Sequence, residues 1–172
     1  DGVIIHASCD IHKSCVIDGP CLIGANTRLR PMVWVREFVR IGEGSDIGHA
    51  CELKNAWLGD HVSLGHYNYV GDSVLGNGAH FGFGAVTSNF RLDQQKILLD
   101  MRGLPLHEEE NKLSQDERSR LEFPKFGALI GDQVEVGANS VINPGKILGK
   151  ASVIYPLQSV LRSVDAHARY QL

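Results

Sequence analysis

A histidine, two tyrosines and an asparagine crowd one short stretch of the sequence, Gly65-His66-Tyr67-Asn68-Tyr69. Imidazole is the side chain that gains and loses a proton most readily near neutral pH, so His66 is a candidate general base. Lys54 precedes this stretch and Asn89 follows it. An ammonium group attracts anions, and an amide hydrogen-bonds polar atoms. These residue types suit a site that holds a polar ligand and removes a proton from it.

A repeat of six residues sets the elements that must position these side chains. Branched aliphatic residues stand at every sixth position from Ile5 to Leu53, and again from Ile130 to Val160. A period of six is neither the 2 of a strand nor the 3.6 of a helix. It predicts a solenoid in which each hexad is a short strand and a corner, and three hexads close a coil of about 18 residues. The aliphatic residue points inward, and the glycine that often follows it permits the corner.

The four cysteines occupy the small inward position of this repeat, two residues before the aliphatic one. They are Cys9, Cys15, Cys21 and Cys51. Cysteine in such a place behaves as a small buried hydrophobe. The spacing contains no CxxC pair, and four cysteines are too few for a disulfide scaffold of this length. We therefore expect neither a metal ligand nor a thiol nucleophile among them.

Composition and charge exclude several classes of partner. The net charge of −3 provides no global positive field for nucleic acid or an anionic membrane surface. No apolar run approaches the ~18 residues needed to span a bilayer, and no charged and apolar leader opens the chain. We therefore expect a cytoplasmic protein.

We expect residues 1–172 to form a single β-helix domain. Residues 91–126 break the repeat and are expected to form an inserted loop in this domain. Residues 107–120 are polar and carry charges of both signs. One interpretation is a solvated loop. The other is a loop that reaches a neighbouring subunit or covers a ligand cleft, because long loops on a rigid scaffold often bind ligands.

The hexad pattern over residues 3–90 and 127–162 resembles the left-handed parallel β-helix of the hexapeptide-repeat acyltransferases. Four segments are similar to the acetyltransferase domain of the bifunctional glucosamine-1-phosphate N-acetyltransferase/N-acetylglucosamine-1-phosphate uridylyltransferase enzymes, archaeal-type versions included. They are ELKNA at 52–56, GHYNYVGD at 65–72, GFGAVTSN at 82–89 and GALIGDQVEVGANSVINPG at 127–145. The resemblance implies an all-β, left-handed parallel β-helix of about seven coils that assembles as a homotrimer.

The same resemblance implies an activity. The enzyme would transfer an acetyl group from acetyl-CoA to the amine of glucosamine-1-phosphate or galactosamine-1-phosphate, in nucleotide-sugar biosynthesis. His66 matches the general base, and Asn89 matches a polar residue near the reacting amine. His80 stands where the family usually has a substrate-contacting asparagine. Ala138 and Pro156 fall where the family lines its acetyl-CoA groove.

Lys54 and Tyr69 match the family's contacts to the sugar and its phosphate. The family also carries an arginine 18 residues before that lysine, which corresponds to Arg36. Residues one coil apart stack side by side, so Arg36 and Lys54 are expected to clamp a phosphate together. Arg30 lies 24 residues before Lys54 and is expected on a different face.

Two other functions stay open. His61 and His66 have the two-histidine spacing of the γ-class carbonic anhydrases, which bind zinc between subunits of the same fold. That family needs a third histidine about two coils earlier, where this chain has Ala25 and Asn26, so we expect no bound metal. The second alternative is a non-catalytic module that oligomerises or regulates a sugar nucleotidyltransferase. It is favoured by the reduction of the family's loop lysines to Lys96.

Overall fold

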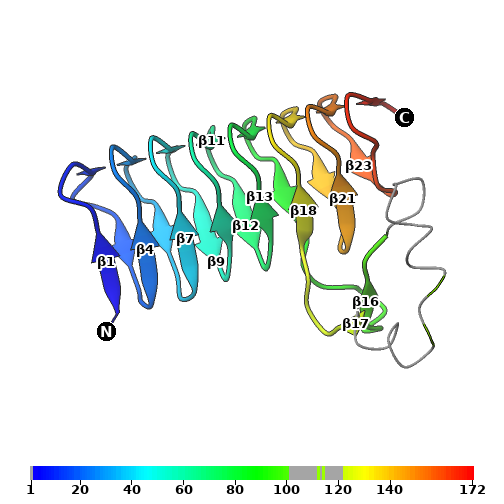
Figure 1. Ribbon diagram of the computed structural model, residues 1–172, viewed down its shortest axis with the longest axis horizontal. Helices are drawn as coiled ribbons and strands as arrows, with labels where there is room; N and C mark the ends of the chain where they lie inside the picture. The colour runs from blue at the N-terminus through cyan, green and yellow to red at the C-terminus, as the bar shows by residue number, and fades with distance from the viewer. Residues whose placement is uncertain (1, 101–111, 113, 115–121) are drawn as a thin grey trace.

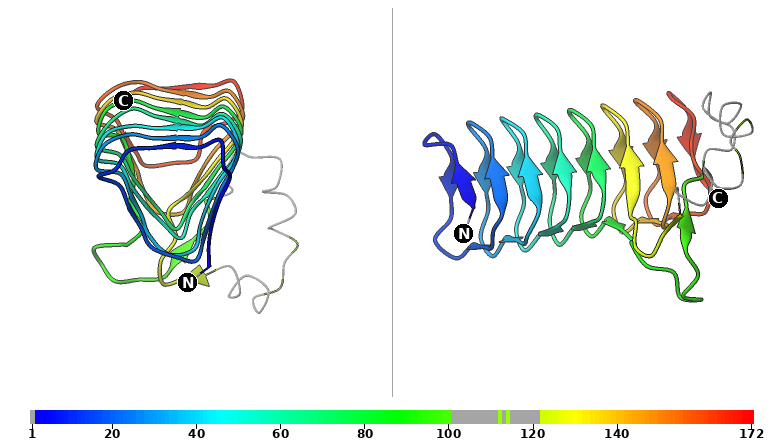
Figure 2. Two further views of the ribbon diagram at one scale, coloured as in Figure 1. Left: turned by 90° about the vertical axis from the view of Figure 1, so that its left-hand side faces the viewer. Right: turned by 60° about the horizontal axis from the view of Figure 1, so that its bottom comes forward.

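The hexads form strands of two or three residues that stack into a triangular prism (Figure 1). The computed structural model describes residues 2–100, 112, 114 and 122–172. Much of the segment that breaks the repeat, residues 101–111, 113 and 115–121, lies outside the described residues. Seen from its N-terminal end in Figure 2, the chain winds left-handed around a triangular cross-section. The expected left-handed parallel β-helix is therefore confirmed.

Three parallel sheets form the sides of the prism. Face 1 contains β1 (Val3–Ile5), β4 (Cys21–Ile23), β7 (Val39–Ile41), β10 (Trp57–Leu58), β13 (Val74–Leu75), β18 (Ala128–Ile130) and β21 (Lys146–Leu148). Face 2 contains β2 (Asp10–Ile11), β5 (Arg28–Leu29), β8 (Asp46–Ile47), β11 (Ser63–Leu64), β14 (His80–Phe81), β19 (Glu135–Val136), β22 (Val153–Ile154) and β24 (Arg169–Tyr170). Face 3 contains β3 (Val16–Ile17), β6 (Trp34–Val35), β9 (Glu52–Lys54), β12 (Tyr69–Gly71), β15 (Val86–Thr87), β20 (Val141–Ile142) and β23 (Ser159–Val160). Among the described residues these strands make seven coils, and β24 adds part of an eighth.

The aliphatic residues of the repeat fill the interior of the prism. Ile41, Leu53 and Leu75 are at most 1% exposed, as the period of six predicts. Cys51 is buried in the same interior, and burial raises the pKa of its thiol to about 11. A thiol in that state stays protonated and is a poor nucleophile.

The chain leaves the prism after β15 and returns at β18. Between them, β16 (Ile97–Leu98) and β17 (Glu122–Phe123) pair antiparallel and lie outside the prism, below its C-terminal half in Figure 1. Asp100 anchors this excursion, because its carboxylate lies 3.3 Å from the ammonium of Lys146 and its N–H donates to the carbonyl of Gly145. In the part of the chain that the structure describes, no helix is long and apolar enough to cross a membrane.

Stacked corners make three edges that run along the prism. The histidine edge joins face 2 to face 3 and carries Pro31, His49, His66, Phe83, Ala138 and Pro156 in successive coils. The lysine edge joins face 3 to face 1 and carries Arg36, Lys54 and Gly71. The capped edge joins face 1 to face 2 and carries Glu43, Asp60, Asn77, Asp132 and Lys150.

Candidate functional site

His66 occupies the corner between β11 and β12, and its side chain is exposed. Backbone hydrogen bonds to both neighbouring coils hold this corner: the N–H of Gly84 donates to the carbonyl of His66, and the N–H of Tyr67 donates to that of His49. Among the described residues the imidazole itself makes no hydrogen bond. It borders a hollow of about 380 Å³ that His49 and Arg30 also line. The imidazole is thus held on a fixed backbone and is available to a ligand.

Asn68 stabilises the corner that carries His66 from the interior of the prism. It is 2% exposed, and its amide donates to the carbonyls of Gly82 and Ala85 at 2.8 and 2.9 Å. Its carbonyl oxygen accepts from the thiol of Cys51 at 3.5 Å. Sequence reasoning missed this role, although Asn68 stands two residues before Val70, at the inward position where the repeat usually places a small residue.

The predicted groove residues lie in line with His66. Successive coils place Phe83, Ala138 and Pro156 on the histidine edge at the same step as His66, with adjacent coils about 4.8 Å apart. The stacking is close: a Cβ atom on Gly137 would lie 2.4 Å from the nitrogen of Pro156. The edge therefore presents a narrow line of apolar side chains that ends at an imidazole.

Arg36 and Lys54 are neighbours at the lysine edge. The N–H of Arg36 donates to the carbonyl of Leu53 at 2.9 Å, which places its side chain one coil from that of Lys54. The Arg36 guanidinium is already occupied, because it donates to a carboxylate oxygen of Glu52 at 2.8 Å and lies 3.7 Å from Glu37. Lys54 is half-buried and makes no ion pair among the described residues. Within the part of the chain that the structure describes, Arg36 is paired with carboxylates and Lys54 is not.

Tyr69 and Asn89 contact each other. The Asn89 amide donates to the phenol oxygen of Tyr69 at 3.0 Å and to the carboxylate of Asp72. Asp72 also accepts from the amide of Asn55 at 2.8 Å. Burial, with a smaller contribution from the nearby Asp72 and Glu52, raises the pKa of the Tyr69 phenol. The phenol therefore keeps its proton and can donate it in a hydrogen bond to a ligand.

Asp72 was not among the predicted site residues. Its signal in the sequence was its place at the end of the GHYNYVGD segment.

The predicted residues fall into two groups at the two borders of face 3. His66 stands at the histidine edge, whereas Lys54 and Asn89 stand at the lysine edge. Five residues of extended chain, roughly 16 Å, separate the two borders. Tyr69 lies on β12 between them and reaches Asn89. A ligand that contacts both groups must lie across face 3, over Tyr69.

Two other histidines stand apart from these groups. His80 lies on face 2, where its Nδ1 is 2.7 Å from a carboxylate oxygen of Glu135. His61 lies on the capped edge, so it does not converge with His66 within one copy. The described residues contain no group of three or more His, Cys, Asp or Glu placed to hold a metal ion.

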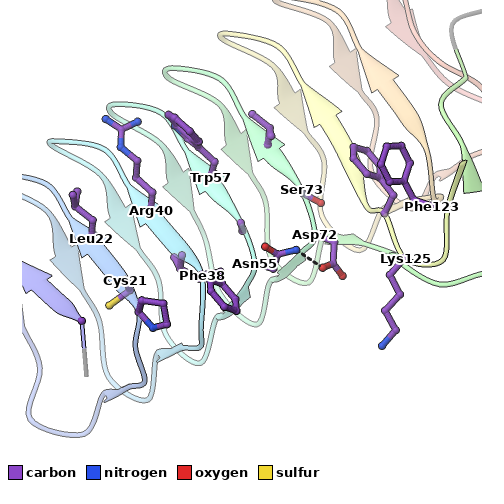
Figure 3. A pocket seen from close by; sticks show the side chains of 16 residues that line it. Cys21, Leu22, Phe38, Arg40, Asn55, Trp57, Asp72, Ser73, Phe123 and Lys125 are labelled. Carbon is purple, nitrogen blue, oxygen red and sulfur yellow. Dashed lines mark hydrogen bonds between the residues drawn. The ribbon is translucent and has the colours of Figure 1, made fainter. Parts of the chain in front are cut away.

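A groove of about 610 Å³ crosses face 1 (Figure 3). Leu22, Arg40 and Trp57 stand in a row along it, and the hydrogen-bonded pair Asn55 and Asp72 forms its border with the lysine edge. The excursion adds the side chains of Phe123, Lys125 and Phe126. Sequence reasoning missed this groove, because the period of six does not show where the excursion places Phe123, Lys125 and Phe126 against face 1.

No family model matches the chain. Among curated relatives, it is 28% identical over 124 residues to the bifunctional protein GlmU of Methanococcus vannielii, a match that covers 72% of this chain and 27% of the relative. It is 31% identical over 134 residues to the bifunctional sugar-1-phosphate nucleotidylyltransferase/acetyltransferase of Sulfurisphaera tokodaii, covering 78% and 30%. The chain thus spans less than a third of the length of these relatives. The resemblance predicted from the motifs is confirmed.

Solved structures share the fold. A hexapeptide transferase family protein from Anaplasma phagocytophilum superposes with a TM-score of 0.58 at 19% identity, over 84% of this chain and 68% of the other. A point mutant of AntD, an N-acyltransferase from Bacillus cereus solved in complex with dTDP and coenzyme A, superposes with a TM-score of 0.51 at 16% identity, over 93% and 74%.

Proposed function

We propose that this protein is an N-acetyltransferase that transfers the acetyl group of acetyl-CoA to the amine of an amino-sugar 1-phosphate. The alignment of His66, Phe83, Ala138 and Pro156 on one edge carries the proposal. A ligand arm laid along Pro156 and Ala138 would end at the imidazole. The similarity to bifunctional enzymes with an acetyltransferase part, and the coenzyme A bound to AntD, support this choice of donor.

The histidine edge suits a thioester donor. Pro156 and Ala138 offer small apolar surfaces for the arm, and the exposed ring of Phe83 is the last apolar contact before His66. The N–H of Phe83 makes no hydrogen bond among the described residues and lies near Gly65, where a Cβ atom would be 3.3 Å from it. A peptide N–H in this place could donate to the oxyanion that forms when the thioester carbonyl is attacked.

Face 3 suits the acceptor. Lys54 would attract the phosphate, with Arg36 beside it, while the Tyr69 phenol would donate a hydrogen bond to the sugar. The amine nitrogen attacks the thioester carbon, and His66 takes the proton that the nitrogen loses. The C–S bond then breaks, and the departing thiolate takes the proton from the imidazolium. No covalent bond to the protein is needed, which agrees with cysteines that lie inside the prism. We also propose a homotrimer, with the reacting groups in a cleft between copies.

Thiol release from acetyl-CoA tests the activity. We expect turnover with glucosamine-1-phosphate or galactosamine-1-phosphate and much weaker turnover with the same amino sugars lacking the phosphate. Lys54→Ala should raise KM for the amino-sugar 1-phosphate and leave KM for the amino sugar without a phosphate nearly unchanged. Folded protein that releases no thiol at saturating donor with any of these acceptors would contradict the proposal and favour the non-catalytic module.

A further inference from the structure

The outward side chains of face 1 and face 3 match each other coil by coil. The face 1 row runs Ile4, Leu22, Arg40, Trp57, Val74, Leu129 and Ile147. The face 3 row runs Val16, Trp34, Glu52, Tyr69, Val86, Val141 and Ser159. Five of the seven coils pair an apolar or aromatic residue on one face with another on the other face, and the seventh pairs Ile147 with Ser159. The third coil instead places a cation, Arg40, level with an anion, Glu52.

Face 2 has a different character. Its outward row runs Asp10, Arg28, Asp46, Ser63, His80, Glu135, Val153 and Arg169. Most of its charged residues pair with one another, since Arg28 lies within 4.0 Å of both Asp10 and Asp46 and His80 contacts Glu135. A row of this kind is suited to water, whereas rows of exposed apolar side chains mark contact surfaces.

Arg40 is the one charged residue in the face 1 row and has no acidic partner among the described residues. Its guanidinium lies 4.6 Å from the centre of the Trp57 ring, and both side chains are exposed beside the groove on face 1 (Figure 3). A cation held over an exposed aromatic ring within an apolar row is well placed to meet an acid from another molecule.

We propose that face 1 of one copy packs against face 3 of the next copy, with Arg40 bridging to Glu52 of that neighbour. The occupant is a second copy because the two rows complement each other in both apolarity and charge at the same level along the prism. The contact centres on coils two to four, and the excursion borders the same groove on face 1 through Phe123 and Lys125 (Figure 3). A contact between two different faces closes into a ring when successive copies are rotated without a shift along the prism, as the matched levels of the two rows require, and three copies give the smallest such ring.

The contact has a consequence for the candidate site, which rests on the proposed function. In a single copy Glu52 holds the guanidinium of Arg36. When the neighbour's Arg40 shares that carboxylate, Glu52 neutralises less of the positive charge of Arg36, although Glu37 stays 3.7 Å from the guanidinium, and Arg36 can act with Lys54 on a phosphate. The neighbouring copy would then contribute to the site through Arg40.

Charge reversal with sedimentation equilibrium tests the interface. Wild-type protein should show three times the chain mass of 18.8 kDa. Arg40→Glu and Glu52→Arg should each weaken assembly by at least about tenfold in concentration, and the double variant should restore it. Arg169→Glu, on face 2, is the matched control and should leave the mass unchanged. Circular dichroism checks that each variant keeps its β structure, and Arg40→Ala supplies a milder variant should either reversal fail to fold.

Several outcomes would overturn the proposal. They are a monomeric wild type, single reversals that leave the trimer intact, a double variant that does not recover, or an Arg40→Glu effect without a Glu52→Arg effect, which would indicate contact between two copies of face 1. Mass is measured without substrate, so a trimer that behaves as expected but releases no thiol would contradict the proposed function alone.

Discussion

The capped edge and the histidine edge are built from the same step of the repeat but use it differently. At the capped edge, side chains cap the backbone of the preceding coil: Asp60 accepts from the N–H of Glu43, Asn77 from that of Asp60, and Asp132 from that of Asn77, all at 2.8–2.9 Å. These polar side chains therefore have a structural role, because they satisfy backbone N–H groups.

At the histidine edge, several side chains are exposed aromatic or imidazole rings. The rings of His49, Tyr67 and Phe83 contact one another edge to face, with centres 5.3 and 5.6 Å apart, and Tyr67 and Phe83 are about half exposed. His66 caps nothing among the described residues. His49 on this edge still bonds the backbone, because its Nδ1 lies 2.9 Å from the carbonyl oxygen of Pro31. At His66 the backbone is satisfied without the side chain, which is left free to carry chemistry. Edges that cap the backbone and edges that carry exposed rings can therefore be told apart by what their side chains bond.

The largest expected effect separates the two edges by activity. His66→Ala should lower kcat for acetyl transfer by about 100-fold or more, the usual contribution of a general base, with an unchanged melting temperature. His61→Asn, at an exposed histidine of the capped edge, is the control and should keep normal turnover. Steady-state kinetics with both variants decides the matter: equal turnover in the two would remove the base assignment from His66.

A second substitution obstructs the line of residues that leads to His66. Ala138→Phe should raise KM for acetyl-CoA roughly tenfold, because an added ring fills the space assigned to the donor arm. Lys150→Phe places the same ring after the equivalent corner glycine on the capped edge. KM for acetyl-CoA should stay unchanged there. A similar rise in both variants would show that the histidine edge is not the donor groove.

The converse experiment breaks the capped edge. Asn77→Ala removes the acceptor for the N–H of Asp60 and should cost about 1 kcal/mol of stability. A loss of that size lowers the melting temperature of a chain of this length by about 2–4 °C. Turnover below the transition should be unaffected. Thermal unfolding followed by circular dichroism measures the change in melting temperature. A drop in kcat with an unchanged melting temperature would show that the capped edge takes part in catalysis and would contradict its structural role.

The smallest effect concerns the interior. A thiol with a pKa of about 11 is ionised in only about one molecule in a thousand at pH 8, so Cys51 should resist N-ethylmaleimide in the folded protein and react in urea. Peptide mass mapping follows the label. Rapid labelling of Cys51 in the native protein would contradict a buried, protonated thiol.

The sequence predicts the fold well because most inward positions obey one short period, with steps of five only at Leu53–Leu58 and Val70–Leu75 between Ile5 and Phe81. Ile41 and Leu53, twelve residues apart, are buried for the same reason, and a single rule places them both. The order of corners follows from the same period, and it is enough to bring Arg36 beside Lys54.

The period does not show which outward side chains pair across coils. Glu52 lies 16 residues after Arg36 and forms an ion pair with it. Glu135 contacts His80, 55 residues earlier in the chain, and the excursion lies between them in the sequence. Such pairs depend on side-chain length and on register across a break in the repeat. Asn68 was hidden for a related reason: a buried amide is stable only where the next coil supplies carbonyls to accept from it.

We propose that acetyl transfer takes place at the histidine edge. A crystal structure with coenzyme A bound tests it most directly. We expect the pantetheine arm to lie along Pro156 and Ala138, to pass Phe83, and to bring its sulfur within hydrogen-bonding distance of the His66 imidazole. Coenzyme A bound in the groove on face 1, or with its sulfur directed away from His66, would contradict it.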